Sequence, residues 1–423
     1  MNEKNYIYIP QNEIESIINN DLNERGWFIT HRCGDDFGKH KLGKTYYNKN
    51  LGKLRVVFKG SITNIKYSPF YSYQNSYIVN QHIKYANTTG SEMLMLVRDD
   101  VENIKTYEGT FTQIGKQVGK HYKNNRNNIS KNNKNIDIAT TNKIIKIYKK
   151  FFPEKLEVYN GIVSIVHNSI EDLIGLELPT GQCSIFGKMI NDTTYIGRSY
   201  DWNKKAEKYV ERYRIVPSNE NYYKFVGVSD MDVPYSEITY FTEDAINDVG
   251  LYIGMTYASH KVDNNVGINA GDMIELLALK CKNVEECIEM FTKVPISFPK
   301  NYFIADKEGN MVVIEHTSGT RFEVIYPKNG ILIHTNHYTN NKLKKEDLNN
   351  GAGFKNSIAR YNLIKKNIKN VNCLTDIIDI LKIKPVFGEY KYYKTIWNLC
   401  MNMKYSYFNF YSNKLKNRKQ IIV

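Results

Sequence analysis

The amino-acid sequence of 423 residues predicts an α+β fold, and two kinds of periodicity support that prediction. Apolar residues recur at helical spacing in 144–166 and again in 272–291, where Asp272 stands at the position of an N-terminal cap. Residues 183–340 carry short strand-like runs instead, separated by Asn-Asp and Asn-Gly turn signals. At roughly 100–200 residues per domain, the length suggests two or three domains.

The N-terminal region differs from the rest of the chain. Residues 1–90 mix short alternating runs, such as 54–58, with polar, tyrosine-rich stretches, and they predict a small α/β or mostly β region. The Asn/Lys-rich segment 123–136 has low complexity and predicts an exposed loop.

Three glycines at positions 109, 115 and 119 raise the question of a phosphate-binding loop. Their spacing misses that of the Walker loop by one residue, and Gln117 follows Lys116 where the magnesium-binding Ser or Thr would stand. We therefore expect no nucleotide site in this segment.

Further along the chain, strands are predicted at 194–196, 312–315 and 330–333, where apolar residues form short runs beside turn signals. The tail, 357–423, alternates helical and aromatic-rich strand patterns. No internal repeat is evident.

The composition excludes several classes of protein. Hydrophobic residues make up 42% and charged residues 24%, which is typical of globular chains and excludes disordered and fibrous proteins. No run of about 18 apolar residues could span a membrane, and the first residues lack the basic-then-apolar order of a secretion signal. Six cysteines in a chain of this length do not make a disulfide framework, so we expect a reducing, cytoplasmic location.

The net charge of +14 is concentrated in residues 116–150, which hold ten basic side chains and one acid. A nucleic acid or an anionic membrane would be attracted by such a segment. However, the whole chain is rich in Lys and Asn, and the segment has neither an RNA-binding aromatic motif nor a helix-turn-helix pattern. We therefore expect a solvated surface and no nucleic-acid partner.

Cysteine spacing gives no sign of a metal site. Cys281 and Cys287 lie six positions apart in a predicted helix, and no second Cys/His pair has the spacing of a zinc site. Core packing explains them better, and no metal is expected.

Residues 181–202 contain the most informative pattern, two strand-like arms around an Asn191-Asp192 turn signal. A two-residue turn would pair Cys183 with Tyr200 and would place Arg198 diagonally from Cys183 on the same face. A three-residue turn would instead place Asp201 opposite Cys183. Either register brings a thiol, a guanidinium and a carboxylate together at one end of a hairpin.

This grouping has a chemical and a structural interpretation. A neighbouring arginine lowers the pKa of a thiol and makes it a better nucleophile. A carboxylate beside the backbone nitrogen of Cys183 becomes useful if that nitrogen is freed as an amine. Alternatively, Cys183 is a buried strand residue, and Arg198 and Asp201 form an ordinary ion pair.

Five motifs, in order, resemble those of cysteine N-terminal nucleophile (Ntn) hydrolases. The nearest branch is the acyl-coenzyme A:6-aminopenicillanate (isopenicillin N) acyltransferase-like family, and choloylglycine hydrolases and acid-ceramidase-like amidases are more distant. The resemblance covers roughly 95–400. The motifs are the glycine pattern of 107–120, Cys-Ser followed by Gly-Arg-x-x-Asp-Trp at 183–202, Ile-Asn-Asp-Val-Gly-Leu at 246–251, His-Thr-Asn-His-Tyr at 334–338 and Ser-x-x-Arg at 357–360.

The resemblance implies a four-layer αββα sandwich of two antiparallel sheets flanked by helices, and a division of the chain. Residues 1–92 would form an extension of unknown role, 93–182 the N-terminal part of the catalytic domain, and 183–423 the part that begins at the nucleophile. Cleavage between Gln182 and Cys183 would leave the two parts as a heterodimer.

The resemblance also implies roles for the residues of the hairpin. Cys183 would attack the carbonyl of Gln182 and release its own α-amine, which would then serve as general base for the thiol. Asp201 would orient that amine, and Arg198 would stabilise the thiolate or a substrate carbonyl.

Two residues outside the hairpin complete the implied site. Asn336 would donate its amide to an oxyanion, together with a backbone N–H near Thr256 or Tyr257. Arg360 would add a second positive charge. The implied substrates are an acyl amide or an acyl thioester, with coenzyme A as one carrier and an amine or water as acceptor, and no cofactor is implied.

This sequence departs from the family pattern in places, and two other functions remain open. Gln182 replaces the usual Gly or Met, Tyr200 varies the residue before Asp201, and residues 1–90 have no counterpart. One alternative is a papain-like site of Cys183, His334 or His337, and Asn336. The other is a non-catalytic binding protein that keeps the fold.

Overall fold

A computed structural model describes the chain in fifteen segments. They are residues 8–9, 27–31, 41–48, 53–59, 93–96, 104–125, 138–166, 169–174, 182–229, 242–260, 266–348, 351–389, 393–404, 407–412 and 419–422. The chain divides into two compact units. The first comprises Met1–Glu102 with the short pieces Cys373–Thr375 and Asn417–Gln420, and the second comprises the remainder. The loop predicted at 123–136 falls largely outside the described residues.

The first unit contains a five-stranded antiparallel sheet, in agreement with the predicted β character of residues 1–90. Its strand order is β1-β5-β4-β3-β2. The strands are β1 (Tyr8–Ile9), β2 (Trp27–His31), β3 (Lys41–Asn48), β4 (Lys53–Lys59) and β5 (Met93–Leu96).

The second unit contains an eight-stranded sheet of order β15-β14-β13-β12-β11-β10-β9-β6 and a six-stranded sheet of order β16-β7-β8-β17-β18-β19. The eight strands are β6 (Lys105–Gly109), β9 (Glu211–Pro217), β10 (Phe225–Ser229), β11 (Thr242–Asn247), β12 (Tyr252–Tyr257), β13 (Lys300–Ala305), β14 (Met311–His316) and β15 (Phe322–Ile325). The six are β7 (Gln182–Ile190), β8 (Thr193–Asn203), β16 (Ile331–His334), β17 (Tyr393–Asn402), β18 (Tyr407–Ser412) and β19 (Lys419–Ile422).

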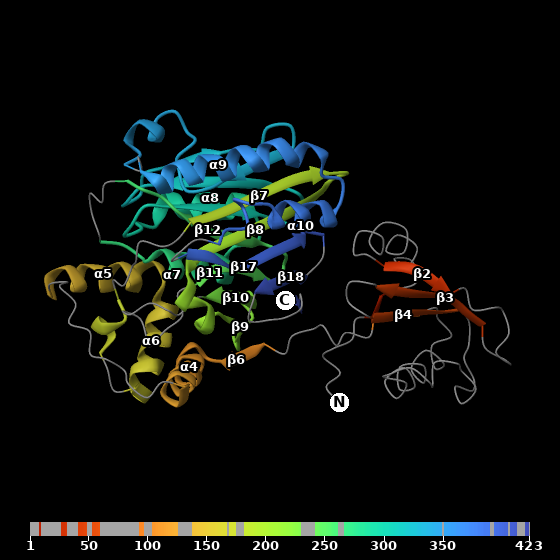
Figure 1. Cartoon of the computed structure of the whole chain (residues 1–423). Helices are drawn as coiled ribbons and strands as arrows, with labels where there is room; N and C mark the ends of the chain where they lie inside the picture. The colour runs from red at the N-terminus through yellow and green to blue at the C-terminus, as the bar shows by residue number, and fades with distance from the viewer. Residues whose placement is uncertain are drawn as a thin grey trace. The chain divides into compact units, whose positions relative to one another are not determined.

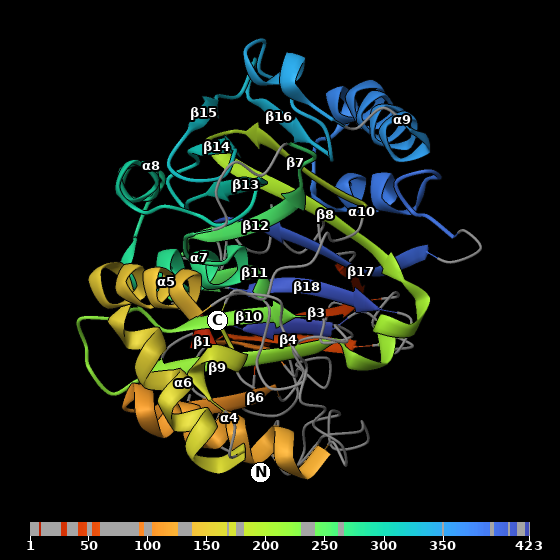
Figure 2. The same cartoon turned by 90° about the vertical axis from the view of Figure 1, so that its left-hand side faces the viewer.

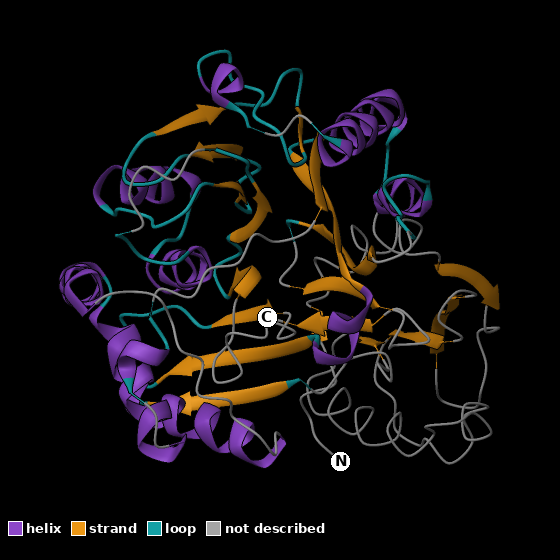
Figure 3. Cartoon of the chain, turned by 60° about the vertical axis from the view of Figure 1, so that its left-hand side comes forward, coloured by secondary structure: helices purple, strands orange, loops and turns teal. Residues whose placement is uncertain are grey.

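Helices lie on the outer sides of both sheets (Figures 1 and 3). The α-helices are α4 (Phe111–Asn125), α5 (Ile138–Phe151), α6 (Pro153–Val166), α7 (Ala270–Lys280), α8 (Val284–Lys293), α9 (Ala352–Asn367) and α10 (Leu374–Lys382). The 3-10 turns are Ile170–Asp172, Lys204–Tyr209, Leu343–Glu346 and Ile368–Asn370.

Two apolar cores hold the layers together. One core packs α4–α8 against the eight-stranded sheet, and the other fills the space between the two sheets. Helix α9 contacts β7 and β16 on the far side of the six-stranded sheet. Viewed along the layers in Figure 2, α4–α8 cover one sheet, and α9 and α10 lie beside the other. The four-layer αββα prediction is confirmed.

Both helices predicted as continuous runs are divided. The run 144–166 breaks at Phe152, because Pro153 has no backbone N–H and begins a new helix. The run 272–291 breaks at Cys281, and each half has its own asparagine cap. Asn269 accepts from the backbone N–H of Asp272, so the prediction of Asp272 as cap is wrong. Asn283 caps α8 in the same way.

Two of the three glycines compared with a phosphate-binding loop, Gly115 and Gly119, are helix-packing positions. A Cβ at Gly115 would lie 2.0 Å from the carbonyl oxygen of Val158, and one at Gly161 would lie 2.4 Å from that of Thr112. Gly119 approaches Ile162 similarly. The glycines therefore let α4 and α6 touch backbone to backbone.

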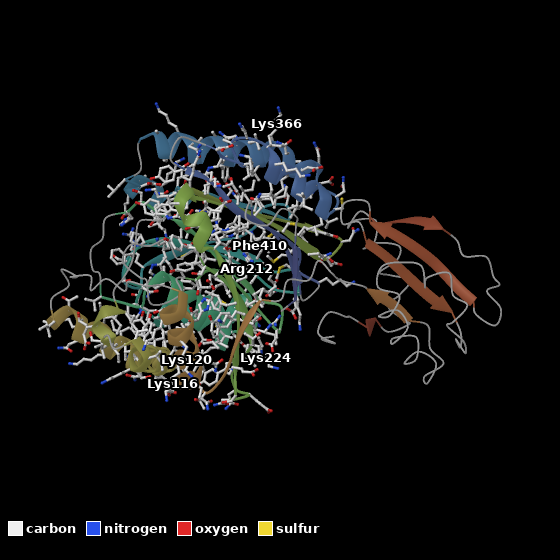
Figure 4. The ribbon with its side chains drawn as sticks, turned by 60° about the horizontal axis from the view of Figure 1, so that its bottom comes forward. Lys116, Lys120, Arg212, Lys224, Lys366 and Phe410 are labelled. Atoms are coloured by element: carbon white, nitrogen blue, oxygen red, sulfur yellow. The ribbon has the colours of Figure 1, made fainter. Side chains whose placement is uncertain are left out.

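The basic segment lies on the surface, as predicted. The seven lysines of 116–150 that the structure describes are all exposed, on α4 and α5. Figure 4 shows Lys116 and Lys120 at one end of the unit and Lys366, on α9, at the other. Among the described residues no helix is long and apolar enough to cross a bilayer.

Candidate functional site

The β7–β8 hairpin has the two-residue turn that the sequence predicts. Asn191 and Asp192 adopt positive φ values of 47° and 58°, as in a type I′ turn. Ile190 therefore pairs with Thr193, and Cys183 lies opposite Tyr200. The alternative three-residue turn is wrong.

Cys183 is the second residue of β7, and its side chain is buried in the core between the sheets. Burial raises the pKa of the thiol to about 11, although the nearby positive charge of Arg198 acts in the opposite direction. In this state of the chain the thiol is protonated at neutral pH, so it requires a base to act as a nucleophile.

Arg198, on β8, lies on the same face as Cys183 and is completely buried. Its Nε donates to both carboxylate oxygens of Asp244, at 3.1 and 3.3 Å, and its Nη1 donates to the carbonyl of Ser199 at 3.2 Å. Nη2 has no hydrogen-bond partner among the described residues.

Asp201 lies opposite Gln182 in the register, beside the Gln182–Cys183 peptide bond. Its Oδ1 accepts from Thr395 Oγ1 at 2.6 Å and from Ser199 Oγ at 3.2 Å. Burial raises the pKa of Asp201 to about 6, against the opposing charge of Arg360 and these two hydrogen bonds. The carboxylate is therefore held by two hydroxyls and is still mainly ionised at neutral pH.

Asn336 and Arg360 hold the backbone of Cys183 from the other side. Asn336 Oδ1 accepts from the Cys183 N–H at 2.6 Å, and Asn336 Nδ2 donates to the carbonyl of Tyr257 at 3.2 Å. Arg360, on α9, donates from Nη1 to the carbonyl of Cys183 and to Ser184 Oγ, and from Nη2 to Asn336 Oδ1 at 2.8 Å. The backbone group near this site is thus the Tyr257 carbonyl, and Asn336 presents its oxygen to the Cys183 nitrogen.

A buried carboxylate fixes the segment that carries Asn336. Glu315, on β14, accepts from His334 Nε2 at 2.9 Å, from the backbone and hydroxyl of Thr339, and from the backbone of Asn340 at 3.0 Å. Burial raises the pKa of Glu315, but these hydrogen bonds outweigh it and hold the pKa below its usual range. Glu315 therefore holds both ends of the turn that follows β16 by hydrogen bonds.

Neither histidine of the papain-like alternative contacts Cys183 by a described hydrogen bond. His334 Nδ1 lies 2.9 Å from the carbonyl of Thr335, and its Nε2 contacts Glu315. His337 Nδ1 lies 2.8 Å from Ser357 Oγ, and burial lowers the pKa of His337 to about 4. Both rings are engaged in holding the turn.

The five residues proposed from sequence therefore converge on one point, the start of β7. Sequence reasoning missed the residues that support them, chiefly Asp244 and Glu315. Glu315 directly follows the apolar run 311–314, and a buried charge beside such a run is a signal of pairing. Asp244 lies in the mostly polar strand Thr242–Asn247 and carries no such signal. No group of three His, Cys, Asp or Glu side chains among the described residues could hold a metal ion.

Comparison with known families finds a match over more than half of the chain. Residues 189–411 match the family described as acyl-coenzyme A:6-aminopenicillanic acid acyl-transferase. Arg198, Asp201, Asn336 and Arg360 lie within the matched range, and Cys183 lies just before it. None of the curated proteins compared with the chain matches it.

Two similar solved structures are a mutant and a variant of the conjugated bile acid hydrolase of Clostridium perfringens. The mutant is 15% identical and the variant 14% identical to this chain, each with a TM-score of 0.38. Each comparison covers 57% of this chain and 92% of the hydrolase.

Proposed function

This chain belongs to the acyl-coenzyme A:6-aminopenicillanic acid acyl-transferase family. From that premise we propose that it is a self-processing enzyme with a cysteine nucleophile that acts on linear amide bonds. It would cleave itself between Gln182 and Cys183 and then transfer an acyl group from an amide or thioester to an amine or to water. The observation that carries the proposal is the convergence of Arg198, Asp201 and Asn336 on the thiol and backbone nitrogen of Cys183.

Self-cleavage would proceed by an N-to-S acyl shift. The sulfur of Cys183 attacks the carbonyl carbon of Gln182, the C–N bond breaks, and the thiol proton passes to the nitrogen, which becomes the α-amine. Water then hydrolyses the thioester and leaves the Gln182 carboxylate and the free thiol. Asn336 Oδ1 already accepts the N–H of Cys183, which supports a role in holding the new amine.

Turnover would use the α-amine as the base that the buried thiol lacks. The amine takes the thiol proton as sulfur attacks the substrate carbonyl, and it returns the proton to the departing amine or coenzyme A thiolate. Water or an acceptor amine then releases the acyl group from sulfur.

The two fragments are expected to stay together as a heterodimer. Lys155 on α6, before the cleavage point, lies 3.0 Å from Asp272 and 2.6 Å from Glu275 on α7, after it, and all three are buried. The hydroxyl groups of Tyr148 and Tyr159 also donate to Asp272. In this proposal residues 93–182 supply helices α4, α5 and α6, and 183–423 supply the nucleophile, helices α7 to α10 and most of both sheets.

Intact mass spectrometry of the purified chain tests the proposal. Wild type should give fragments of about 21 and about 28 kDa, by proportion of the 49.3 kDa chain, with the larger beginning at Cys183. Cys183→Ala should remain one chain. Cys281→Ala, which removes a buried thiol of the helix layer, should cleave like wild type.

Intact mass, amine labelling and an activity assay together separate the alternatives. A wild-type chain that stays whole, with no N-terminal cysteine found by amine labelling, overturns self-processing. Loss of activity in His337→Ala together with full activity in Asp201→Asn would favour the papain-like site instead.

A further inference from the structure

We propose that Asp244 is a positioning residue that aims the guanidinium of Arg198 at the thiol of Cys183. The proposal rests on the proposed function for the use of that thiol. The geometry concerns the thiol itself and is independent of whether the chain cleaves.

The carboxylate of Asp244 is held from both sheets. Tyr252 Oη, on the neighbouring strand β12, donates to Oδ1 at 2.7 Å, and Trp397 Nε1, on β17 of the other sheet, donates to Oδ2 at 3.2 Å. Asp244 is 1% exposed. Because four hydrogen bonds in total reach these two oxygens, the carboxylate has one orientation.

That orientation determines where Arg198 points. Its Nε is bound to Asp244 and its Nη1 to the carbonyl of Ser199, and the guanidinium is a rigid planar fork. Two fixed donors leave Nη2 as a donor available to the site. Nη2 has no hydrogen-bond partner among the described residues, and the carboxylate oxygen paired with it, Glu243 Oε2, lies 3.9 Å away. Arg198 also opposes the effect of burial on the pKa of Cys183.

The backbone leaves room for this arrangement. Gly254 lies opposite Asp244 in the β11–β12 register. A Cβ at Gly254 would lie 2.3 Å from Tyr252 Oη and 2.5 Å from Asp244 Oδ1, closer than real contacts allow. A side chain there would displace the Tyr252–Asp244 hydrogen bond.

Other ionisable groups also face the thiol and Arg198. Glu243, on β11, lies 3.9 Å from Arg198 Nη2, and both Glu243 and Asp201, on β8, raise the pKa of Cys183. Tyr252, on β12, faces Arg198, and Arg360, on α9, donates to the backbone carbonyl of Cys183. Removing a negative charge alone should lower the pKa of the thiol. If the guanidinium of Arg198 instead turns away from the thiol, the pKa of the thiol should rise. The sign of the change therefore distinguishes the two roles.

The experiment is alkylation of Cys183 by iodoacetamide between pH 7 and 10, followed by peptide mass spectrometry on the full chain. Below the thiol pKa the rate is proportional to the thiolate fraction, and one pKa unit is tenfold in rate. Asp244→Asn should slow alkylation about tenfold at each pH. Glu243→Gln, the matched control, should accelerate it, because Glu243 raises the thiol pKa without a hydrogen bond to Arg198 in the described geometry.

Cys287, buried in the helix layer, provides an internal reference for unfolding. Its alkylation should be equal in wild type and the variants. An unchanged or faster Cys183 rate in Asp244→Asn overturns the proposal. If Asp244→Asn does not fold, Trp397→Phe decides, since it removes one hydrogen bond to Asp244. Trp397→Phe should slow the alkylation of Cys183 about threefold, and an unchanged alkylation rate overturns the proposal.

The readout is distinguishable from that of the proposed function. Intact mass reports cleavage, and alkylation reports the thiol in either form of the chain. Wild-type protein that never cleaves, but whose Cys183 responds to Asp244→Asn as expected, would contradict self-processing and support the positioning role.

Discussion

Asn336 Oδ1 accepts the backbone N–H of Cys183 at 2.6 Å and the Nη2 of Arg360 at 2.8 Å. Two donors on one oxygen determine which way the amide faces, because an –NH₂ group could not accept either bond. The amide nitrogen consequently faces the carbonyl of Tyr257. An asparagine in this orientation can hold the amine of a cleaved chain with its oxygen and offer its nitrogen to a substrate.

The two ends of Asn336 can be tested separately. Asn336→Ala removes both groups and should slow self-cleavage and turnover by about 100-fold, the typical cost of losing a donor to an oxyanion. Asn336→Asp keeps an acceptor for the Cys183 N–H and loses the donor. It should therefore retain more self-cleavage than Asn336→Ala, as followed by intact mass over time. Equal rates for the two variants would contradict a role for the oxygen.

The ionisation of Asp201 should make the rate of self-cleavage fall at acidic pH, as an acidic limb of the pH–rate profile. Burial raises the pKa of Asp201 to about 6, so the carboxylate is protonated below that pH and ionised above it. Only the ionised form can stabilise the positive charge that the Cys183 nitrogen acquires when it is protonated and the C–N bond breaks. The cleavage rate should therefore rise as the pH passes upward through about 6. Asp201→Asn should be slower at pH 7 by at least about tenfold and should lack this limb.

A control for that profile is Asp192, an acid of the hairpin turn at the other end of β8. Asp192→Asn keeps the positive φ that this turn requires and should leave the limb in place. A limb that persists in Asp201→Asn would assign the titration to another group.

Sequence reasoning predicted the site where local rules apply. A two-residue turn and a side-chain period of two were enough to place Cys183 opposite Tyr200 and Arg198 on the same face. Pro153 and Asn283, which mark the starts of the second helices in the two divided runs, are local signals as well. The helical periodicity of the flanking residues concealed them.

The supporting residues could not be predicted in the same way. Asp244 reaches Trp397 across 153 positions of sequence, and Cys183 reaches Asn336 across a similar interval. No local rule relates residues so far apart. The first contact depends on how the two sheets pack, and the second depends on the pairing of β16 with β7 in one sheet. The orientation of Asn336 likewise depends on Arg360, which reaches it from helix α9.

The contact between α4 and α6 predicts a stability effect at a glycine. A Cβ at Gly115 would lie 2.0 Å from the carbonyl oxygen of Val158, so the helices must separate to accept one. Gly115→Ala should lower the free energy of unfolding by about 1–3 kcal/mol, measured by urea denaturation. Gly351→Ala meets nothing within 4 Å and should lower the free energy of unfolding by less, at most about 1 kcal/mol, for the exchange of an N-cap glycine for alanine.

A buried histidine gives the last prediction. His316 is completely buried, stacks on Phe322 with a centroid distance of 6.2 Å, and contacts Phe291. Neither ring nitrogen has a hydrogen-bond partner among the described residues. Two unpaired polar atoms in an apolar environment are costly, so His316→Phe should raise the free energy of unfolding at pH 7 by about 1–3 kcal/mol.

The effect of His316→Phe should grow in acid. Burial lowers the pKa of His316 to about 3, whereas the unfolded chain takes up the same proton near 6.5. The unfolded state therefore binds more protons between these values, and stability is lost as the pH falls through that window. At pH 5 the difference amounts to about 2 kcal/mol, which the phenylalanine variant should regain. The pKa of His337 is lowered to about 4, so His337 also makes stability depend on pH, equally in wild type and in His316→Phe. Urea denaturation at pH 5 and pH 7.5 measures the difference, and parallel pH slopes for wild type and His316→Phe would contradict a neutral, unpaired ring at position 316.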